Sequence, residues 1–488
     1  MFDVIPFAFQ YLLTPNGALF FVLGVIIGLT IGVVPGIGAS ATIAMLLPLT
    51  FRWNPMDAFV FFTAIFGSTT VGGSITAILL NVPGTPENIM TTIDGYPMAR
   101  KGRAAEAIAT AAFASLCGGL VSWIVFFTSL PLLRMMSSLF GPAEVFWLVF
   151  FAIIIISAVS RGSFLGNMAL SGFAFLLSFH GMSSVTGVPR FTHGILYLYE
   201  GFDLTSAILG TYAVSEMIKL FIERKPISYE EVKITGSRKQ GILNVLKNKG
   251  IFFRSVVIGY IVGVTPGIGG MVAQAVSYAQ TVQLAKDREN FGKGDPRGII
   301  GPESANNAKD VGQLVPTVSL GIPGSATMAI LLAAMLIHGL QPGPFFMRDH
   351  PEIVALITVT LLLAFLASCN IALFAGSYLA RITKIQPYWI FPTVITVCLV
   401  AVYYVKYEIL DAFTVLFFGI FGYIVSKLGL SRILIVMPLI LGPLVEYNLS
   451  LALSISRGDI TYFFSPVSII LIISMILTII YPFIKGRK

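Results

Sequence analysis

Apolar segments long enough to cross a lipid bilayer recur along the whole chain, and they restrict its fold more than any other feature of the sequence. A membrane-spanning helix needs about 20 predominantly apolar residues. The clearest such segments are 17–34, 105–133, 145–159, 353–380, 388–404 and 466–484. Because a bilayer offers no water to backbone groups, segments that cross it fold as helices. The sequence therefore predicts an all-α polytopic membrane protein with roughly 10–13 crossings, several of them interrupted by proline and glycine.

The composition argues against a soluble protein of this length. Of the 488 residues, 56% are hydrophobic and only 11% are charged, whereas about 25% of the residues of a typical soluble domain are charged. The net charge of +8 raises the alternative of nucleic-acid binding, but no basic stretch is interleaved with aromatic residues. In a membrane protein such an excess is typical of cytoplasmic loops. We expect a multi-pass membrane protein that binds no nucleic acid.

The longest polar stretch of the chain lies near its middle. Residues 223–254 include eight basic and three acidic side chains, which places the stretch in the cytoplasm by the positive-inside rule. We expect this stretch to be a linker between two halves of the membrane domain, residues 1–222 and residues 255–488.

Two motifs rich in proline and glycine occur once in each half. The first, Gly-x3-Gly-Val-x-Pro-Gly-Ile-Gly, begins at Gly28 and again at Gly259. The second, a Pro-Gly pair followed by a hydroxyl residue, occurs at Pro83 and again at Pro323. The two copies of the second motif are slightly farther apart, because a longer charged segment, 286–297, separates the motifs of the second half. The chain is therefore interpreted as an internal duplication.

The charges of the loops indicate how the two repeats face the membrane. In the first half the basic residues follow the second motif, at Arg100, Lys101 and Arg103. In the second half they lie between the two motifs, in segment 286–297. Because basic loops are retained on the cytoplasmic side, equivalent loops of the two halves are expected on opposite faces. The sequence thus predicts two inverted structural repeats with broken helices or re-entrant hairpins.

Each repeat contains two Pro-Gly breaks within apolar sequence. Proline removes a backbone donor and glycine allows non-helical geometry, so such breaks at membrane depth normally line a polar cavity. A break also creates a half-helix N-terminus that suits a carboxylate, and a C-terminus whose carbonyls suit a cation. The hydroxyl side chains after each break are also ordinary N-caps, which is the alternative for any one of them. The candidate substrate-binding residues at the breaks are Pro35, Gly36, Gly38, Ser40, Thr42, Pro83, Gly84, Thr85, Pro266, Gly267, Gly269, Pro323, Gly324, Ser325 and Thr327.

A polar cluster, residues 303–310, leads into an apolar helix of the second repeat. Asn306 and Asn307 can both donate and accept hydrogen bonds, which suits a carboxylate or Na⁺, so they are candidates for substrate binding and for a Na⁺ site. Ionisable residues inside a membrane indicate function by default. The alternative is that Glu303 lies at the interface while Lys309 and Asp310 form a structural pair. Glu87 and Asp94 of the first repeat are open to the same two interpretations.

The sequence provides little support for an enzyme. Residues 292–295 match the GxGD pattern of intramembrane aspartyl proteases, but they lie in a charged loop without a partner aspartate in an apolar helix. There is no HExxH sequence, no Walker A motif and no clustering of the four histidines or three cysteines. We expect no bound cofactor and no hydrolysis of ATP by the chain itself, so any transport would be coupled to an ion gradient or to another subunit.

Several of these motifs together resemble the large membrane subunit of tripartite tricarboxylate transporters, the TctA family. The resemblance covers nearly the whole chain and includes Pro35-Gly36-Ile37-Gly38, residues 81–86, 94–102, 303–308 and 321–325, and residues 337–344. One departure is Lys309-Asp310, which stands where small residues are expected. The resemblance implies a secondary transporter for citrate and other small carboxylates, driven by Na⁺ or protons. It also implies two partners, a small four-helix membrane subunit and a periplasmic solute-binding protein.

The sequence therefore predicts the large membrane subunit of a binding-protein-dependent importer of small carboxylates. Two alternatives remain open. The first is a scaffold or sensor subunit that has kept the fold but transports nothing, and the second is an ion-selective channel.

Overall fold

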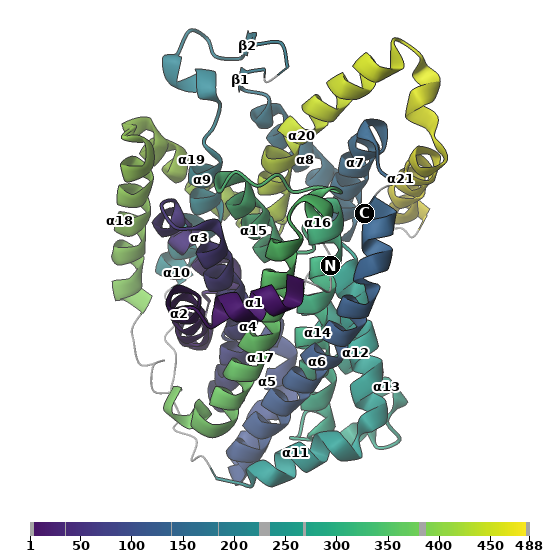
Figure 1. Cartoon of the computed structure of the whole chain (residues 1–488). Coiled ribbons are helices and arrows are strands. Elements are labelled where there is room, and N and C mark those ends of the chain that lie inside the picture. The colour runs from purple at the N-terminus through teal and green to yellow at the C-terminus, as the bar shows by residue number, and fades with distance from the viewer. Residues whose placement is uncertain are drawn as a thin grey trace.

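The computed structural model describes residues 4–34, 36–137, 139–183, 185–223, 235–266, 270–379 and 387–484. Within these ranges nearly all regular structure is helical (Figure 1). The strands of the described part are β1 (Gly181–Met182) and β2 (Pro189–Arg190), which pair antiparallel in a short hairpin. The prediction of an all-α fold is confirmed.

The helices that precede the central basic stretch include long apolar helices and several short ones. They are α1 (Ile5–Leu12), α2 (Pro15–Val33), α3 (Ala39–Leu46), α4 (Pro55–Leu80), α5 (Ile89–Met98), α6 (Ala104–Ser137), α7 (Pro142–Val159), α8 (Phe164–Ser178), α9 (Leu204–Ile208) and α10 (Ser215–Glu223). The helices that follow are likewise of unequal length. They are α11 (Arg238–Lys247), α12 (Lys249–Val264), α13 (Gly270–Leu284), α14 (Arg297–Leu320), α15 (Ala326–Ile337), α16 (Phe346–Asp349), α17 (Pro351–Leu379), α18 (Pro387–Lys406), α19 (Ile409–Lys427), α20 (Ile433–Ser456) and α21 (Pro466–Ile484).

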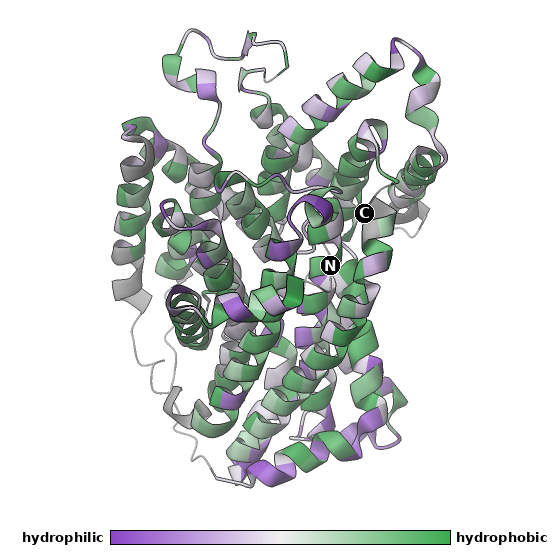
Figure 2. Cartoon of the chain, in the orientation of Figure 1, coloured by the Kyte–Doolittle hydropathy of each residue, from purple (hydrophilic) through white to green (hydrophobic). Residues whose placement is uncertain are grey.

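Seven segments of the described chain are long and apolar enough to cross a membrane, and five shorter apolar helices accompany them. In Figure 2 the long helices are mainly hydrophobic, whereas hydrophilic residues concentrate on α11 and the neighbouring segments at the bottom of the view. A multi-pass membrane protein is the arrangement that buries such helices. Within this arrangement the most apolar part of α4 is completely buried in protein, and most of α14 is buried as well. These two helices form the centre of the molecule.

The two halves of the chain pack corresponding helices against each other at corresponding residues. In the first half α2 lies on α4, and an ideal Cβ on Gly28 would lie 2.8 Å from the carbonyl oxygen of Ile65. In the second half α12 lies on α14, and a Cβ on Gly259 would lie 2.4 Å from the carbonyl oxygen of Ala305. The two glycines are the first residues of the two copies of the first motif. Each of them therefore permits the same close helix–helix approach.

The central helices also end in the same way. Asn81 follows α4 with φ 56° and Gly321 follows α14 with φ 70°, both in the left-handed region. After each turn the chain runs back beside its own helix, so that Gly84 lies against Gly73 and Gly324 lies against Gln313. The next helix, α5 or α15, then begins beside the body of the central helix rather than beyond its end.

One end of the molecule is formed by segments 99–103 and 285–297, which we call the basic end. There the Lys101 ammonium donates a hydrogen bond to the carbonyl oxygen of Lys293 (2.6 Å). Helix α5 ends here and α14 begins here. The loop after the second motif of the first half therefore lies beside the loop between the motifs of the second half.

The opposite pair of loops also lies together. The Thr50 hydroxyl, before α4, is 3.2 Å from Nε2 of His338, which follows α15. Gly321, after α14, lies against the backbone of Gly343. We call this the His338 end. It follows that α4 runs from the His338 end towards the basic end, whereas α14 runs in the opposite direction.

The remaining long helices pack around this centre. Helix α6 packs on α14 and helix α17 on α4, while α6 and α17 also contact each other. Helices α7, α8, α20 and α21 form a second group, and the π-helical segment Leu209–Val214 packs on α19. Helices α6 and α17 thus cover α14 and α4 directly, whereas α20 of the second group reaches them through α15.

Candidate functional site

The two breaks of the first repeat meet each other. The backbone N–H of Gly36, at φ 91°, donates to the carbonyl oxygen of Gly84 (3.2 Å), and the N–H of Gly84 donates to the carbonyl oxygen of Gly73 (3.3 Å). A Cβ on Gly84 would lie 2.1 Å from the carbonyl oxygen of Gly32. Only glycine allows this approach, so the predicted residues Gly36 and Gly84 are brought together by close packing. Pro35 lies outside the described residues.

Of the two breaks of the second repeat, the structure describes only the one at Pro323 in full. Gly267 and Gly269 lie outside the described residues, and Pro266 is half-buried before them. At the other break Pro323 and Gly324 are buried. There the Ser325 hydroxyl donates to Oε1 of Gln313 (2.9 Å), and it accepts from the N–H of Met328 as the N-cap of α15.

The other predicted hydroxyl residues do not cap a helix. The Thr42 hydroxyl donates to the carbonyl oxygen of Gly38 (3.0 Å) within its own helix start. The Thr85 hydroxyl donates to Oδ1 of Asn88 (2.7 Å) and is buried. Ser40 and Thr327 are half-buried. Pro83 is half-buried beside Gly84.

Glu303 of α14 is the centre of a buried polar network. Its carboxylate accepts hydrogen bonds from the hydroxyls of Ser74 (2.8 Å), Thr91 (2.5 Å) and Ser115 (2.7 Å), on α4, α5 and α6. Asn88, in turn, donates to the Ser74 hydroxyl (2.8 Å). Glu303 is completely buried within the protein. A carboxylate is retained at this depth because three helices supply donors to it.

Asn306 and Asn307 are buried on the same helix but face different neighbours. The Asn306 amide lies 3.5 Å from the Glu303 carboxylate, whereas the Asn307 amide faces the sulfur of Cys369 on α17 at 3.9 Å. Their side-chain oxygens accept a hydrogen bond from no described residue. Oδ2 of the neighbouring Asp310 is likewise buried without a described donor. Several acceptor oxygens thus occur close together along α14 with too few donors.

Lys309 forms a buried ion cluster that joins the two repeats. Its ammonium pairs with Asp310 (2.7 Å) on the same helix and with Glu87, which lies just after the second break of the first repeat. The pairing of Lys309 with Asp310, the structural alternative for these residues, is present. Glu87, however, comes from the other half of the chain, so a purely local pair is an incomplete description.

Glu87 also reaches the start of α13, after the first break of the second repeat. A Cβ on Gly270 would lie 2.6 Å from Oε1 of Glu87 and 2.6 Å from Cε of Lys309. In the equivalent arrangement on the other side, α15 packs against α3. Each repeat therefore places the helix after its second break against the helix that follows the first break of the other repeat.

A small cavity adjoins the Glu303 network. It has a volume of about 10 Å³, roughly the space that one water molecule needs, and lies between α4, α6 and α17, with the Ser74 and Ser115 hydroxyls and apolar side chains such as Ile75 and Ile108 in its wall. Cavities that hold small-molecule ligands are typically about 300–1,000 Å³. This cavity is too small for a citrate-sized anion, so binding of such an anion requires the surrounding helices to move.

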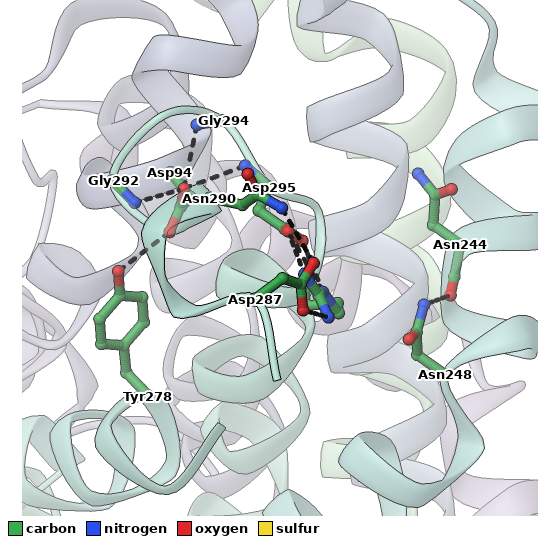
Figure 3. Close-up of polar contacts among 10 residues, drawn as sticks. Asp94, Asn244, Asn248, Tyr278, Asp287, Asn290, Gly292, Gly294 and Asp295 are labelled. Carbon is green, nitrogen blue, oxygen red and sulfur yellow. Dashed lines mark hydrogen bonds and ion pairs between the residues drawn. The ribbon is translucent and has the colours of Figure 1, made fainter. Parts of the chain in front are cut away.

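The charged loop 285–297 holds the end of α5 through Asp94 (Figure 3). One carboxylate oxygen of Asp94 accepts hydrogen bonds from the backbone N–H groups of Gly292 (2.8 Å), Gly294 (3.0 Å) and Asp295 (3.0 Å), and the other accepts from the Tyr278 hydroxyl (3.0 Å). Successive backbone amides of this kind form an anion-binding concavity. The GxGD sequence therefore serves to bind a carboxylate of the other repeat.

Arg297 fixes the same loop from its other side. Its guanidinium donates to Asp287 (2.9 and 2.6 Å) and to Asp295 (2.6 Å). The hydrogen bonds from Arg297 hold the pKa of the Asp287 carboxyl well below its usual range. The Asp287 carboxylate therefore remains ionised at physiological pH, and the loop keeps its shape around Asp94.

The sequence identifies the breaks and the polar cluster of α14, but it gives no sign of several residues of the network. Ser74, Thr91 and Ser115 lie in apolar segments where isolated hydroxyl residues are common. Glu87 is ambiguous in the sequence, and its partner Lys309 belongs to the other half of the chain. A pairing of this kind becomes visible only when the two halves are folded together.

Comparisons with known proteins agree with this description. Residues 18–437 match the Tripartite tricarboxylate transporter TctA family. The chain is 34% identical over 462 residues to an uncharacterised 52.8 kDa protein from the TAR-I ttuC′ 3′ region of Agrobacterium vitis, covering 93% of this chain and 90% of that protein. It is 33% identical over 210 residues to an uncharacterised protein from the TAR-II ttuC′ 3′ region of the same organism, covering 42% of this chain and 85% of that protein.

No solved structure matches the chain. The family match nevertheless covers all four helix breaks, the Glu303 network and the ion cluster of Lys309. Membership of a transporter family also agrees with the expectation that the chain is not an enzyme. The chain belongs to the tripartite tricarboxylate transporter TctA family.

Proposed function

We propose that the chain is the large membrane subunit of a secondary transporter that imports small carboxylates, such as citrate or a related organic anion, into bacteria. The observation that carries this proposal is the meeting of helix breaks from both repeats beside the polar face of α14. Glu87, after a break of the first repeat, contacts Gly270, after a break of the second. Transporters commonly bind their substrates where discontinuous helices of two repeats meet.

The two halves are proposed to be inverted repeats, residues 1–222 and 255–488, joined by a cytoplasmic linker at 223–254. The opposite directions of α4 and α14 support this proposal. So does the pairing of Lys101 with Lys293 at the basic end and of Thr50 with His338 at the other. Because basic loops are retained in the cytoplasm, the basic end is assigned to the cytoplasmic face of the inner membrane.

The substrate carboxylates are proposed to bind at the half-helix N-termini of the breaks. The N-terminus of a helix carries partial positive charge and unpaired N–H groups. In the conformation described, Ser325 occupies such a position as the N-cap of α15. Movement of one repeat relative to the other would expose these groups first to one side of the membrane and then to the other.

The coupling ion is proposed to be Na⁺ or a proton. Asn306, Asn307 and Asp310 carry buried oxygens without a described donor, and a set of amide and carboxylate oxygens suits a hard cation. Bound Na⁺ would give these oxygens a positively charged partner. A proton on Asp310 would serve the same purpose.

Two partners complete the proposed system, a periplasmic solute-binding protein and a small four-helix membrane subunit. The binding protein would deliver the anion to the face opposite the basic end.

The proposal is tested by uptake of radiolabelled citrate into proteoliposomes that contain this chain and the small subunit. The binding protein is added outside, with or without an inward Na⁺ or proton gradient. Accumulation that requires both the binding protein and a gradient is expected. Malate and succinate are assayed in the same way.

Two outcomes would favour the alternative functions. Gradient-independent ohmic conductance in the same membranes would indicate an ion-selective channel. Binding of the solute-binding protein without movement of any of these anions would indicate a scaffold or sensor subunit.

A further inference from the structure

We propose that Lys309 binds a carboxylate of the transported anion, and that Glu87 occupies this position until the anion displaces it. The inference rests on the proposed function, because it assigns a residue to the carboxylate that the transporter would carry. It is specific to this chain in one respect, since Lys309 and Asp310 stand where the family resemblance leads us to expect small residues.

The burial of Lys309 requires an anionic partner. Its side chain is only 1% exposed, and an unpaired ammonium at this depth would be very costly. Asp310, with a side-chain exposure of 0%, is a fixed partner. Glu87 is 25% exposed and is the one of the two carboxylates that reaches the surface. Glu87 can therefore leave the ion cluster while Asp310 stays paired with Lys309.

Glu87 shows where a carboxylate fits. It lies against the ammonium of Lys309 and beside Gly270 in the first turn of α13, whose partial positive charge favours an anion. A Cβ at residue 270 would overlap the carboxylate, with 2.5 Å to its carbon atom. The absence of a side chain at Gly270 thus leaves room for a carboxylate at this position. In the unloaded protein a carboxylate of the chain itself fills that room.

The exchange preserves the charge of the site. Before loading, one ammonium is paired with two carboxylates, those of Glu87 and Asp310. After loading, the substrate carboxylate takes the place of Glu87, and Lys309 again faces two carboxylates. Because the buried charge is unchanged, the exchange avoids the cost of adding an uncompensated anion. The displaced Glu87 side chain lies on the segment between the break and α5, so its release also removes one of the contacts between the two repeats.

The decisive variant is Glu87→Gln, because it is expected to improve binding. If Glu87 occupies Lys309 about nine-tenths of the time, removal of its charge should lower the Kd of the anion about ten-fold. Misfolding cannot produce a gain of affinity. Kd is measured by equilibrium dialysis of radiolabelled citrate, malate and succinate with the purified complex of this chain and the small subunit. Glu289→Gln, on the exposed loop of the basic end, is the matched control and should leave Kd unchanged.

The complementary variant is Lys309→Gln, for which Kd should rise at least ten-fold, as expected for loss of a charged hydrogen bond. The wild-type protein should also bind the mono-amide of its substrate more weakly than the substrate itself, and Lys309→Gln should reduce this discrimination. Lys219→Gln, at a half-exposed ion pair, is the control.

The possible failures are separable. If the wild-type protein takes up its anion but Glu87→Gln binds that anion no more tightly, Glu87 is only a structural partner and the inference is wrong, while the proposed function stands. If the wild-type protein neither binds nor moves any of the carboxylates, both are wrong.

Discussion

Glu303 accepts hydrogen bonds from three hydroxyl groups on three different helices, and it is completely buried. A single carboxylate therefore joins α14 to α4, α5 and α6. Its removal would leave Ser74, Thr91 and Ser115 without their shared acceptor. At the scale of the residue, the centre of this protein is held together by polar contacts of a few side chains rather than by apolar packing alone.

We expect Glu303→Ala to destabilise the protein by about 3 kcal/mol or more, because each buried polar group left without a partner costs roughly 1–3 kcal/mol. Glu303→Gln should cost less, since its amide oxygen still accepts a hydrogen bond. Thermal unfolding of the purified protein in detergent measures both effects, with the exposed Glu289→Ala as control. An equal melting temperature for Glu303→Ala and the control would show that the network contributes little to stability.

Helix ends and loops determine how the elements of the two repeats join. The loop 285–297 turns through Gly292 and Gly294 at φ 78° and 92°, which directs successive N–H groups at Asp94. A side chain at residue 294 would also meet the backbone N of Met98 at 2.9 Å. The loop thus attaches the basic end of α5 to the start of α14.

Gly294→Ala should therefore detach this loop. The left-handed conformation costs a non-glycine residue about 1–2 kcal/mol, and the contact with Met98 adds to this cost. We expect faster tryptic cleavage at Lys293 and a lower melting temperature. Gly250→Ala is the control, because Gly250 is exposed in α12 and a Cβ there meets no atom within 4 Å. Cleavage of the two variants at the same rate would contradict the proposed role of the loop.

At the scale of the whole molecule, two polypeptide halves place their central helices side by side in opposite directions. The same close approaches recur at matching positions of α4 and α14, for example at Gly73 and Gln313. At each end of the molecule, the loop between the two motifs of one half contacts the loop after the second motif of the other half. This arrangement encloses a polar region between the halves that either half alone would expose to lipid.

The arrangement predicts a definite pattern of accessibility across the membrane. In a background without Cys117, Cys369 and Cys398, Lys101→Cys and Lys293→Cys should both be labelled by a membrane-impermeant maleimide from the cytoplasmic side only. Arg52→Cys and Gln341→Cys, at the His338 end, should both be labelled from the periplasmic side only. Labelling of Lys101→Cys and Lys293→Cys from different sides would contradict the inverted arrangement.

The sequence was sufficient to predict an all-α membrane protein, because long apolar segments without internal charge have no other stable structure in water or lipid. It also located the four breaks, since proline and glycine act through the local backbone. The repeat of Gly28 and Gly32 at Gly259 and Gly263 follows from the same local requirement. The glycines at these positions allow another helix to pack closely. The motif predicts this close packing, but it does not identify the helix that packs there.

Other features could not be predicted because they depend on contacts between distant parts of the chain. The sequence alone left Glu303 at the interface as an alternative, whereas the folded chain buries it completely. The charged loop 285–297 contains a pattern typical of a protease motif, but its amides bind Asp94 from the other half. Short hydroxyl side chains such as Ser115 carry no distinguishing pattern at all.

By itself, then, the sequence determined that this protein belongs in a lipid bilayer, that its apolar segments are helices and where those helices break, because each depends on the properties of a short segment. Only the tertiary structure decided which breaks meet, which carboxylate faces Lys309 and which hydroxyls surround Glu303. The physical reason is that an ion pair or a hydrogen bond is local in space but not in sequence. Glu87 and Lys309 become neighbours only when α5 and α14 pack across the boundary between the repeats.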